Sequence, residues 1–146
     1  MGKDSPATSA LSRSAPATEL LAAESLGASL TVSDLAASVA WYRDVFGFAV
    51  DREHRREDKL IAVSLRAGGV RILLTQDNGA RGSDRAKGEG FSLLLTTTQD
   101  IDALAAGIRA RGGSLDSEPA DIAGMRAFRL HDPDGFRFTV STPLAG

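Results

Sequence analysis

The chain has 146 residues, of which 42% are hydrophobic and 25% charged, with a formal net charge of −2 and no cysteine. These totals suit one compact domain or two small fused modules, and they exclude disulfides, thiolate nucleophiles and cysteine-ligated metals. There is no clustered basic face for nucleic acid, and no apolar run approaches the roughly 20 residues of a membrane span. The lack of cysteine fits a reducing compartment, so we expect a cytoplasmic protein.

The N-terminal residues 1–24 are rich in Ser, Ala, Thr and Pro, a composition typical of a disordered tail. After the tail, alternating apolar and polar residues predict a strand over Gly27–Val32. An N-cap at Ser33-Asp34 and apolar residues at helical spacing then predict a helix that ends at Gly47. Three further strands are expected over Phe48–Arg52, Leu60–Arg66 and Val70–Gln76.

Two connections in this half also carry predictions. The charged run Arg52–Lys59 is interpreted as a solvated connection, with His54 as an exposed loop residue. The glycine-rich residues 77–90 are interpreted as a mobile flap between two halves. They lack the Gly-Lys-Ser/Thr ending of a phosphate-binding loop, so nucleotide binding is not expected there.

The same order of elements then begins again. A strand is predicted over residues 91–97, and a helix follows from Asp100 to Gly112-Gly113. Weaker strands cover residues 114–120 and 125–130. The segment Asp132-Pro133-Asp134-Gly135 is a strong turn signal, and the alternation after it predicts the last strand.

The two halves superimpose at one offset, because Asp34 falls on Asp100 and Gly69 on Gly135, each 66 residues later. We therefore predict an α+β fold of tandem βαβββ modules that form a cup-shaped mixed sheet. The domain is expected at residues 25–146, with module one at 25–78, a linker at 79–89 and module two at 90–143. One helix per module covers one sheet face, so the uncovered faces form the cup that binds a ligand.

The helix segment from Asp34 to Phe48 and the strand after Asp132-Pro133-Asp134-Gly135 resemble the vicinal oxygen chelate superfamily. That superfamily includes glyoxalase I, bleomycin-resistance proteins, fosfomycin-resistance proteins and extradiol dioxygenases. The resemblance covers residues 26–143 and implies the tandem fold described above. It also implies, for the enzymes, a divalent metal held by His, Glu or Gln on the first and last strands of each module.

The positions that correspond to those metal ligands are occupied here by Gly27, Leu73, Leu93 and Thr139. A shift of the fifth strand by one or two residues brings in Ser92 or Phe91, which are no better as ligands. Because none of these side chains binds a divalent metal with useful affinity, we expect no metal and no cofactor.

The bleomycin-resistance branch is the more similar one, since it binds a drug in the cup without a metal and is usually dimeric. We therefore expect a metal-free small-molecule binding protein that forms a homodimer, without nucleic-acid or membrane partners. The alternative is a metal-dependent lyase or oxidoreductase of the glyoxalase or dioxygenase kind, so enzymatic activity stays open. A third possibility is a dimerising accessory module with an empty cup.

The expected ligand-binding residues fall into three kinds. The apolar floor is assigned to Leu73, Leu93 and Leu95, and the polar end of the ligand to Arg71, Arg137 and Thr139. Arg71 and Arg137 are repeat mates, which means that they occupy equivalent positions in the two modules. They either bind a carboxylate or phosphate group of the ligand, or they extend past the sheet edge into solvent. His131 is expected at the cup mouth as a base or hydrogen-bond donor, or else as a partner of the turn.

Overall fold

The structure is a computed structural model that describes residues 19–82 and 85–145. Residues 1–18 of the predicted tail lie outside the described residues, and residues 19–27 form neither helix nor strand. In chain order the elements are β1 (Ala28–Val32), α1 (Leu35–Trp41), the π-helical turn η1 (Tyr42–Phe46), β2 (Ala49–Arg56), β3 (Lys59–Ala67), β4 (Val70–Gln76), β5 (Leu93–Thr96), α2 (Ile101–Ala110), β6 (Ser117–Ile122), β7 (Met125–His131) and β8 (Arg137–Pro143).

The strands form two four-stranded mixed sheets of matching topology. The first has the order β1-β4-β3-β2 and the second β5-β8-β7-β6. In each sheet the first and last strands of the module pair in parallel, and the other pairs are antiparallel. The predicted α+β fold of tandem βαβββ modules is confirmed.

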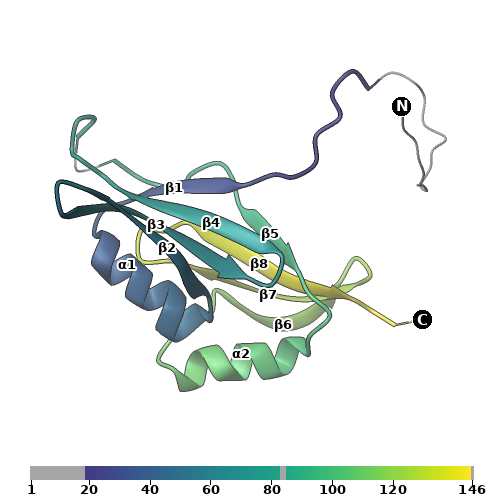
Figure 1. The fold of residues 1–146 in the computed structure, drawn as a ribbon. Helices are drawn as coiled ribbons and strands as arrows, with labels where there is room; N and C mark the ends of the chain where they lie inside the picture. Colours follow the sequence, from purple (N-terminus) through teal and green to yellow (C-terminus); the bar gives the residue numbers. More distant parts are fainter. Residues whose placement is uncertain (1–18, 83–84, 146) are drawn as a thin grey trace.

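The helices lie on the same side of the two sheets (Figure 1). Both begin at an aspartate whose carboxylate accepts the backbone N–H three residues later, at Asp34 and Asp100. The apolar sheet faces pack under these helices into one continuous core that includes Tyr42, Leu65 and Phe138. The opposite sheet faces are left without helices, and this arrangement positions the site.

The charged run Arg52–Lys59, predicted to be a solvated connection, is mostly strand in the structure. Residues Arg52–Arg56 continue β2 and pair with β3, and only Glu57 and Asp58 turn, both with positive φ. Charged side chains suit an edge strand because they discourage pairing with other chains. His54 is accordingly half-buried on β2 rather than in an exposed loop, with Nε2 3.1 Å from Oγ of Ser64.

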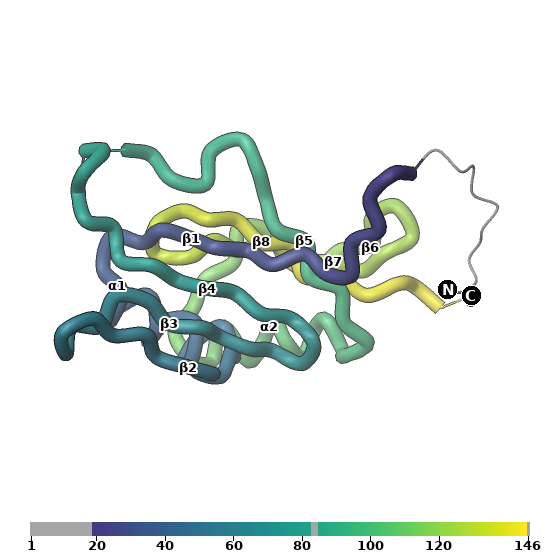
Figure 2. The backbone as a smooth tube through the Cα atoms, turned by 45° about the horizontal axis from the view of Figure 1, so that its top comes forward, coloured from purple at the N-terminus to yellow at the C-terminus, as the bar shows by residue number. Residues whose placement is uncertain are grey.

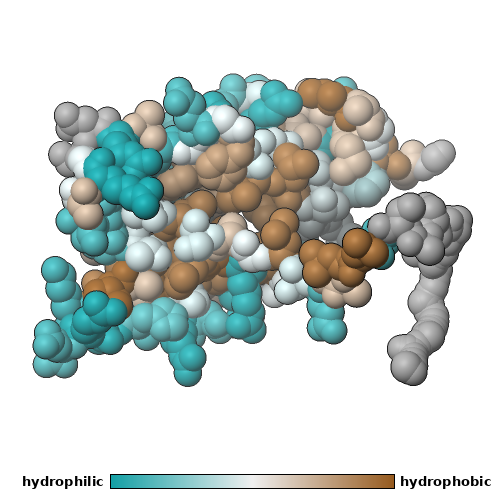
Figure 3. Space-filling model, turned by 90° about the horizontal axis from the view of Figure 1, so that it is seen from above, coloured by the Kyte–Doolittle hydropathy of each residue, from teal (hydrophilic) through white to brown (hydrophobic). Residues whose placement is uncertain are grey.

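The connection from β4 to β5 passes over the β1 edge of the first sheet (Figure 2). The face opposite the helices carries hydrophobic side chains at its centre and toward its right-hand end, while hydrophilic ones dominate its left and lower margins (Figure 3). Within residues 19–82 and 85–145, no helix has the length and apolar character needed to cross a bilayer.

Candidate functional site

The open face of the second sheet is built by β5, β7 and β8. Thr139 on β8 lies between Leu94 on β5 and Arg129 on β7, while Arg137 pairs with His131. Because side chains alternate across a strand, these five residues point to the side away from α2. Their inward neighbours Phe138 and Leu130 are buried in the core.

Two adjoining cavities lie on this open face. The first, here called the apolar cavity, has a volume of about 260 Å³, and its lining includes Leu94, Ile122 and Met125. The second, the charged cavity, has a volume of about 420 Å³, and its lining includes Asp116, Arg129 and Arg137. Leu94, Arg129 and Thr139 line both cavities, so the two form one trough across the sheet.

Three of the predicted polar site residues lie on this face. Thr139 and Arg137 line the charged cavity, and Nη2 of Arg137 donates to the carbonyl of Gly88 at 3.3 Å. His131 lies beside Arg137, and its Nδ1 is 2.8 Å from Oδ1 of Asp116. His131 itself lines neither cavity, so the structure places it at the margin of the trough.

The positions expected for Leu93 and Leu95 on the cup floor are corrected by the structure. Both pack against the core beside the buried Phe138 and Val140. Leu94, which the sequence reasoning did not select, faces the trough instead and is 73% exposed. Since side chains alternate, an error of one residue in register moves every side chain of a strand to the other face.

That error has a local cause in the connection between β5 and α2. Ser29 pairs with Leu73 in the first sheet, and Leu94 pairs with Thr139 in the second. The offset on β5 is therefore 94 − 29 = 65 residues, one less than in the helices. The second module has one additional residue between its first strand and its helix. The use of one 66-residue offset for the whole repeat did not reveal this insertion.

Arg71 and Leu73 lie on the first sheet, apart from the trough. Nη1 of Arg71 is 3.3 Å from Oδ2 of Asp51, and the arginine side chain is 70% exposed. Leu73 is half-buried on the face that also carries Ser29. Neither residue lines the apolar cavity or the charged cavity.

The four positions at which the resemblance implies metal ligands can now be assigned from the corrected register. They carry Gly27 and Leu73 in the first module and Ser92 and Thr139 in the second. A glycine and a leucine offer no donor, and two neutral hydroxyls form a poor site for a divalent ion. In the parts of the chain that the structure describes, no three His, Cys, Asp or Glu side chains come together as a metal site. The donor set therefore does not fit a metal.

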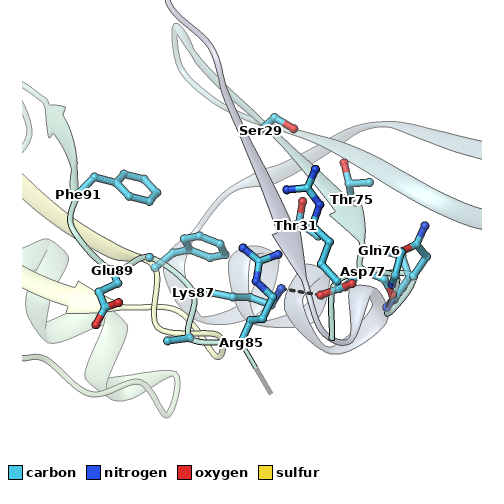
Figure 4. A pocket seen from close by; sticks show the side chains of 15 residues that line it. Ser29, Thr31, Thr75, Gln76, Asp77, Arg85, Lys87, Glu89 and Phe91 are labelled. Atoms are coloured by element: carbon cyan, nitrogen blue, oxygen red, sulfur yellow. Dashed lines mark hydrogen bonds and ion pairs between the residues drawn. The ribbon is translucent and has the colours of Figure 1, made fainter. Parts of the chain in front are cut away.

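A third cavity, of about 770 Å³, lies under the β4–β5 connection. Thr31 and Thr75 border it from the first sheet and Phe91 from the second module (Figure 4). Nζ of Lys87 binds Oδ2 of Asp77 at 2.7 Å across the two ends of the connection. This hydrogen bond from Lys87, followed by that from the N–H of Gly79, lowers the pKa of Asp77.

The residues that the sequence reasoning missed are Leu94, Asp116 and Ile122. Ile122 ends β6 and is 54% exposed, and Asp116 immediately precedes that strand. Local pattern gives little signal for them, because β6 is an edge strand with an irregular register against β7. Only the position of the strand in the sheet brings them to the trough.

Comparison with known sequences agrees with this architecture. The family model described as "Glyoxalase/Bleomycin resistance protein/Dioxygenase superfamily" matches residues 25–140. The chain is 30% identical over 117 residues to "Lactoylglutathione lyase GLX1" of Arabidopsis thaliana, an alignment that covers 75% of this chain and 40% of that relative. The chain thus spans less than half the length of this curated relative.

Comparison with solved structures gives the same fold. TnmS3, an antibiotic binding protein from Streptomyces sp. CB03234, is similar with a TM-score of 0.68 and 21% identity, covering 86% of this chain and 100% of that one. A superfamily member from Sphaerobacter thermophilus is similar with a TM-score of 0.68 and 24% identity, covering 84% and 99%. At these identities the likeness concerns the fold alone.

Proposed function

The chain belongs to the glyoxalase/bleomycin resistance protein/dioxygenase superfamily, and from this premise we propose that it is a metal-free small-molecule binding protein. The ligand lies in the trough on the open face of the second sheet. The observation that carries the proposal is the pairing of an apolar cavity with a charged one around Thr139. Ligand sites typically combine such an apolar wall with a few polar groups that set orientation.

The side chains at the family's metal positions support binding without a metal. Gly27, Leu73, Ser92 and Thr139 supply no carboxylate, imidazole or thiolate. An antibiotic binding protein among the structural neighbours is consistent with a binding role in this fold.

A thermal-shift screen of hydrophobic anions and cations tests the proposal. A ligand that binds only the folded protein raises its melting temperature, and at about 100 times its Kd it adds about 2.7 kcal/mol. The variant Thr139→Trp fills the wall shared by both cavities without adding charge and should abolish the shift. The matched variant Thr98→Trp, at an exposed loop position, should keep it. If no compound shifts the wild type, or if both variants bind equally, the trough is not the site.

A metal-dependent lyase is the second candidate, because the chain is 30% identical to a lactoylglutathione lyase. Elemental analysis of protein purified without chelator separates the two proposals. Stoichiometric zinc, nickel, manganese or iron together with lactoylglutathione lyase activity would establish the enzyme and reject the metal-free binding role. Protein without bound metal that retains the ligand-induced shift supports our proposal.

We also propose that the protein is a homodimer. Because the exposed Leu94 and Ile122 line the apolar cavity, the proposed dimer contact lies outside the trough. Its support is the resemblance to the bleomycin-resistance branch, whose members are usually dimeric. Light scattering after size exclusion should give twice the mass of one chain. A mass of one chain at all concentrations would contradict the dimer.

A further inference from the structure

The trough changes in chemistry along its length. At one end Leu94, Ile122 and Met125 line the apolar cavity. At the other end Arg129, Arg137 and Asp116 line the charged cavity. A single molecule that occupies both cavities must therefore be apolar at one end and charged or strongly polar at the other.

The charge at the polar end is positive. Arg129 and Arg137 bring two guanidinium groups, and Asp116 brings one carboxylate. That carboxylate already contacts Nδ1 of His131, at 2.8 and 3.0 Å. Among the described residues neither arginine forms an ion pair with an acidic side chain. Because the carboxylate of Asp116 offsets only one of the two guanidinium charges, the cavity carries one positive charge in excess.

The guanidinium of Arg137 also retains donors for a ligand. Its one contact in the described chain runs from Nη2 to the carbonyl of Gly88, at 3.3 Å. A guanidinium carries five N–H donors in a planar fork, so most remain available for an oxyanion. The contact with Gly88 holds the side chain beside the trough.

The first sheet does not offer free guanidinium donors in the same way, although Arg71 there occupies the position equivalent to Arg137. There Arg71 and Arg66 lie opposite each other on β4 and β3, and both contact the carboxylate of Asp51, at 3.3 and 3.6 Å. An anion would have to compete with that carboxylate. Of the two open sheet faces, the second is therefore the one whose arginines are available to an anion.

We infer that the ligand of the trough is an amphipathic anion. Its carboxylate or phosphate group binds Arg129 and Arg137, and its aliphatic or aromatic body lies over Leu94 and Ile122. The inference rests on the proposed function and names the ligand class of that same site.

Calorimetric titration with four simple probes tests the inference. Octanoate and octyl phosphate carry both features, octylammonium reverses the charge, and acetate lacks the apolar body. We expect the two octyl anions to bind more tightly than octylammonium and acetate. The stronger of the two octyl anions identifies the head group as carboxylate or phosphate.

Two variants and a matched control locate the head group. Arg137→Gln should weaken the binding of the octyl anions roughly 10- to 100-fold, because a charge-assisted hydrogen bond is lost. Arg66→Gln removes a guanidinium from the open face of the first sheet and should leave binding unchanged. If circular dichroism shows that Arg137→Gln is unfolded, Arg129→Gln provides the same measurement on the neighbouring strand.

The outcomes separate this inference from the proposed function. Tighter binding of octylammonium, or octyl anions whose affinity is unaffected by Arg137→Gln and by Arg129→Gln, overturns the anionic ligand class. If Thr139→Trp still abolishes that binding, the trough remains the binding site. If no probe binds and the wider thermal-shift screen is also negative, both proposals fail.

Discussion

The hydroxyl of Tyr42 donates a hydrogen bond of 2.8 Å to Oδ2 of Asp132, and both residues are buried. Tyr42 lies in η1 of the first module, and Asp132 begins the turn between β7 and β8 of the second. The other carboxylate oxygen, Oδ1, accepts the backbone N–H groups of Asp134 and Phe136, at 2.9 and 2.8 Å. One carboxylate therefore shapes the β7–β8 turn and joins the two modules.

Removing the carboxylate should destabilise the protein strongly. Asp132→Ala leaves two buried donors, the hydroxyl of Tyr42 and the N–H of Phe136, and the partly buried N–H of Asp134 without a partner. Each buried group left in this way costs about 1–3 kcal/mol. Tyr42→Phe removes only one donor, to a charged acceptor, and should cost about 1.5–3 kcal/mol. Urea unfolding of the two variants measures the difference. An Asp132→Ala variant as stable as Tyr42→Phe would contradict the role of the carboxylate in the turn.

The stability of the protein should respond to pH through Asp132. Burial raises the pKa of this carboxyl above its ordinary value of 3.8, although hydrogen bonds from Tyr42, Phe136 and Asp134 act in the opposite direction. The folded chain therefore holds this proton more tightly than the unfolded chain. The contribution of the group is fully present below pH 3.8 and is lost as the pH rises through its folded-state pKa.

The variant Asp132→Asn isolates this contribution because an amide does not titrate. The unfolding free energy of the wild type minus that of Asp132→Asn should fall as the pH rises from about 3 to about 7. Asp44→Asn is the contrasting control, since a hydrogen bond from Arg43 lowers the pKa of the exposed Asp44. The unfolding free energy of the wild type minus that of Asp44→Asn should instead rise with pH. A flat profile for Asp132→Asn would refute the burial effect.

The contact of the β4–β5 connection with the β7–β8 turn should depend on Gly88. This residue has φ +75°, and a Cβ there would lie 2.8 Å from the carbonyl oxygen of Gly135. Gly90 also has a positive φ, of +89°, but a Cβ there would meet nothing within 4 Å. Gly90→Ala should therefore cost about 1 kcal/mol for the backbone conformation alone, and Gly88→Ala at least about 1 kcal/mol more.

Trypsin provides the readout for this pair. Displacement of the connection by Gly88→Ala should accelerate cleavage after Lys87, whose side chain is largely buried against Asp77 in the wild type. Gly90→Ala should leave the cleavage rate close to that of the wild type. Equal rates in the two variants would show that Gly88 does not hold the connection against the β7–β8 turn.

The fold was predictable from sequence because its signals are local and repeated. The N-caps at Asp34 and Asp100 are borne out by the structure, and the repeated glycines Gly69 and Gly135 precede β4 and β8. The register of β5 was not predictable, because one additional residue in a loop leaves no trace in the alternation of three leucines. Which of Leu93, Leu94 and Leu95 point to the core depends on how β5 pairs with β8. In the structure Leu93 pairs with Phe138, so Leu93 and Leu95 point to the core and Leu94 points to the open face.

The candidate site depended more heavily on tertiary structure. Thr139 and Arg137 were accessible to sequence reasoning because they follow a strong turn on an alternating strand. The interaction of Arg71 with Asp51 was not accessible to sequence reasoning. It joins β4 to β2, and the pairing of β2 with the intervening β3 has an irregular register at Asp51. Repeat mates therefore have the same position in their sheets but different electrostatic surroundings.

The register of β5 can itself be tested with neighbouring leucines. Leu93 packs against the core beside Phe138, so Leu93→Ala should lower the unfolding free energy by about 2 kcal/mol. Leu94 is 73% exposed, so Leu94→Ala should change stability by no more than about 0.5 kcal/mol while weakening octanoate binding in the trough. Urea unfolding and calorimetry on the same samples measure both effects. The reverse assignment, with stability lost at Leu94 and binding lost at Leu93, would place β5 one residue out of the register described above and return Leu93 to the open face.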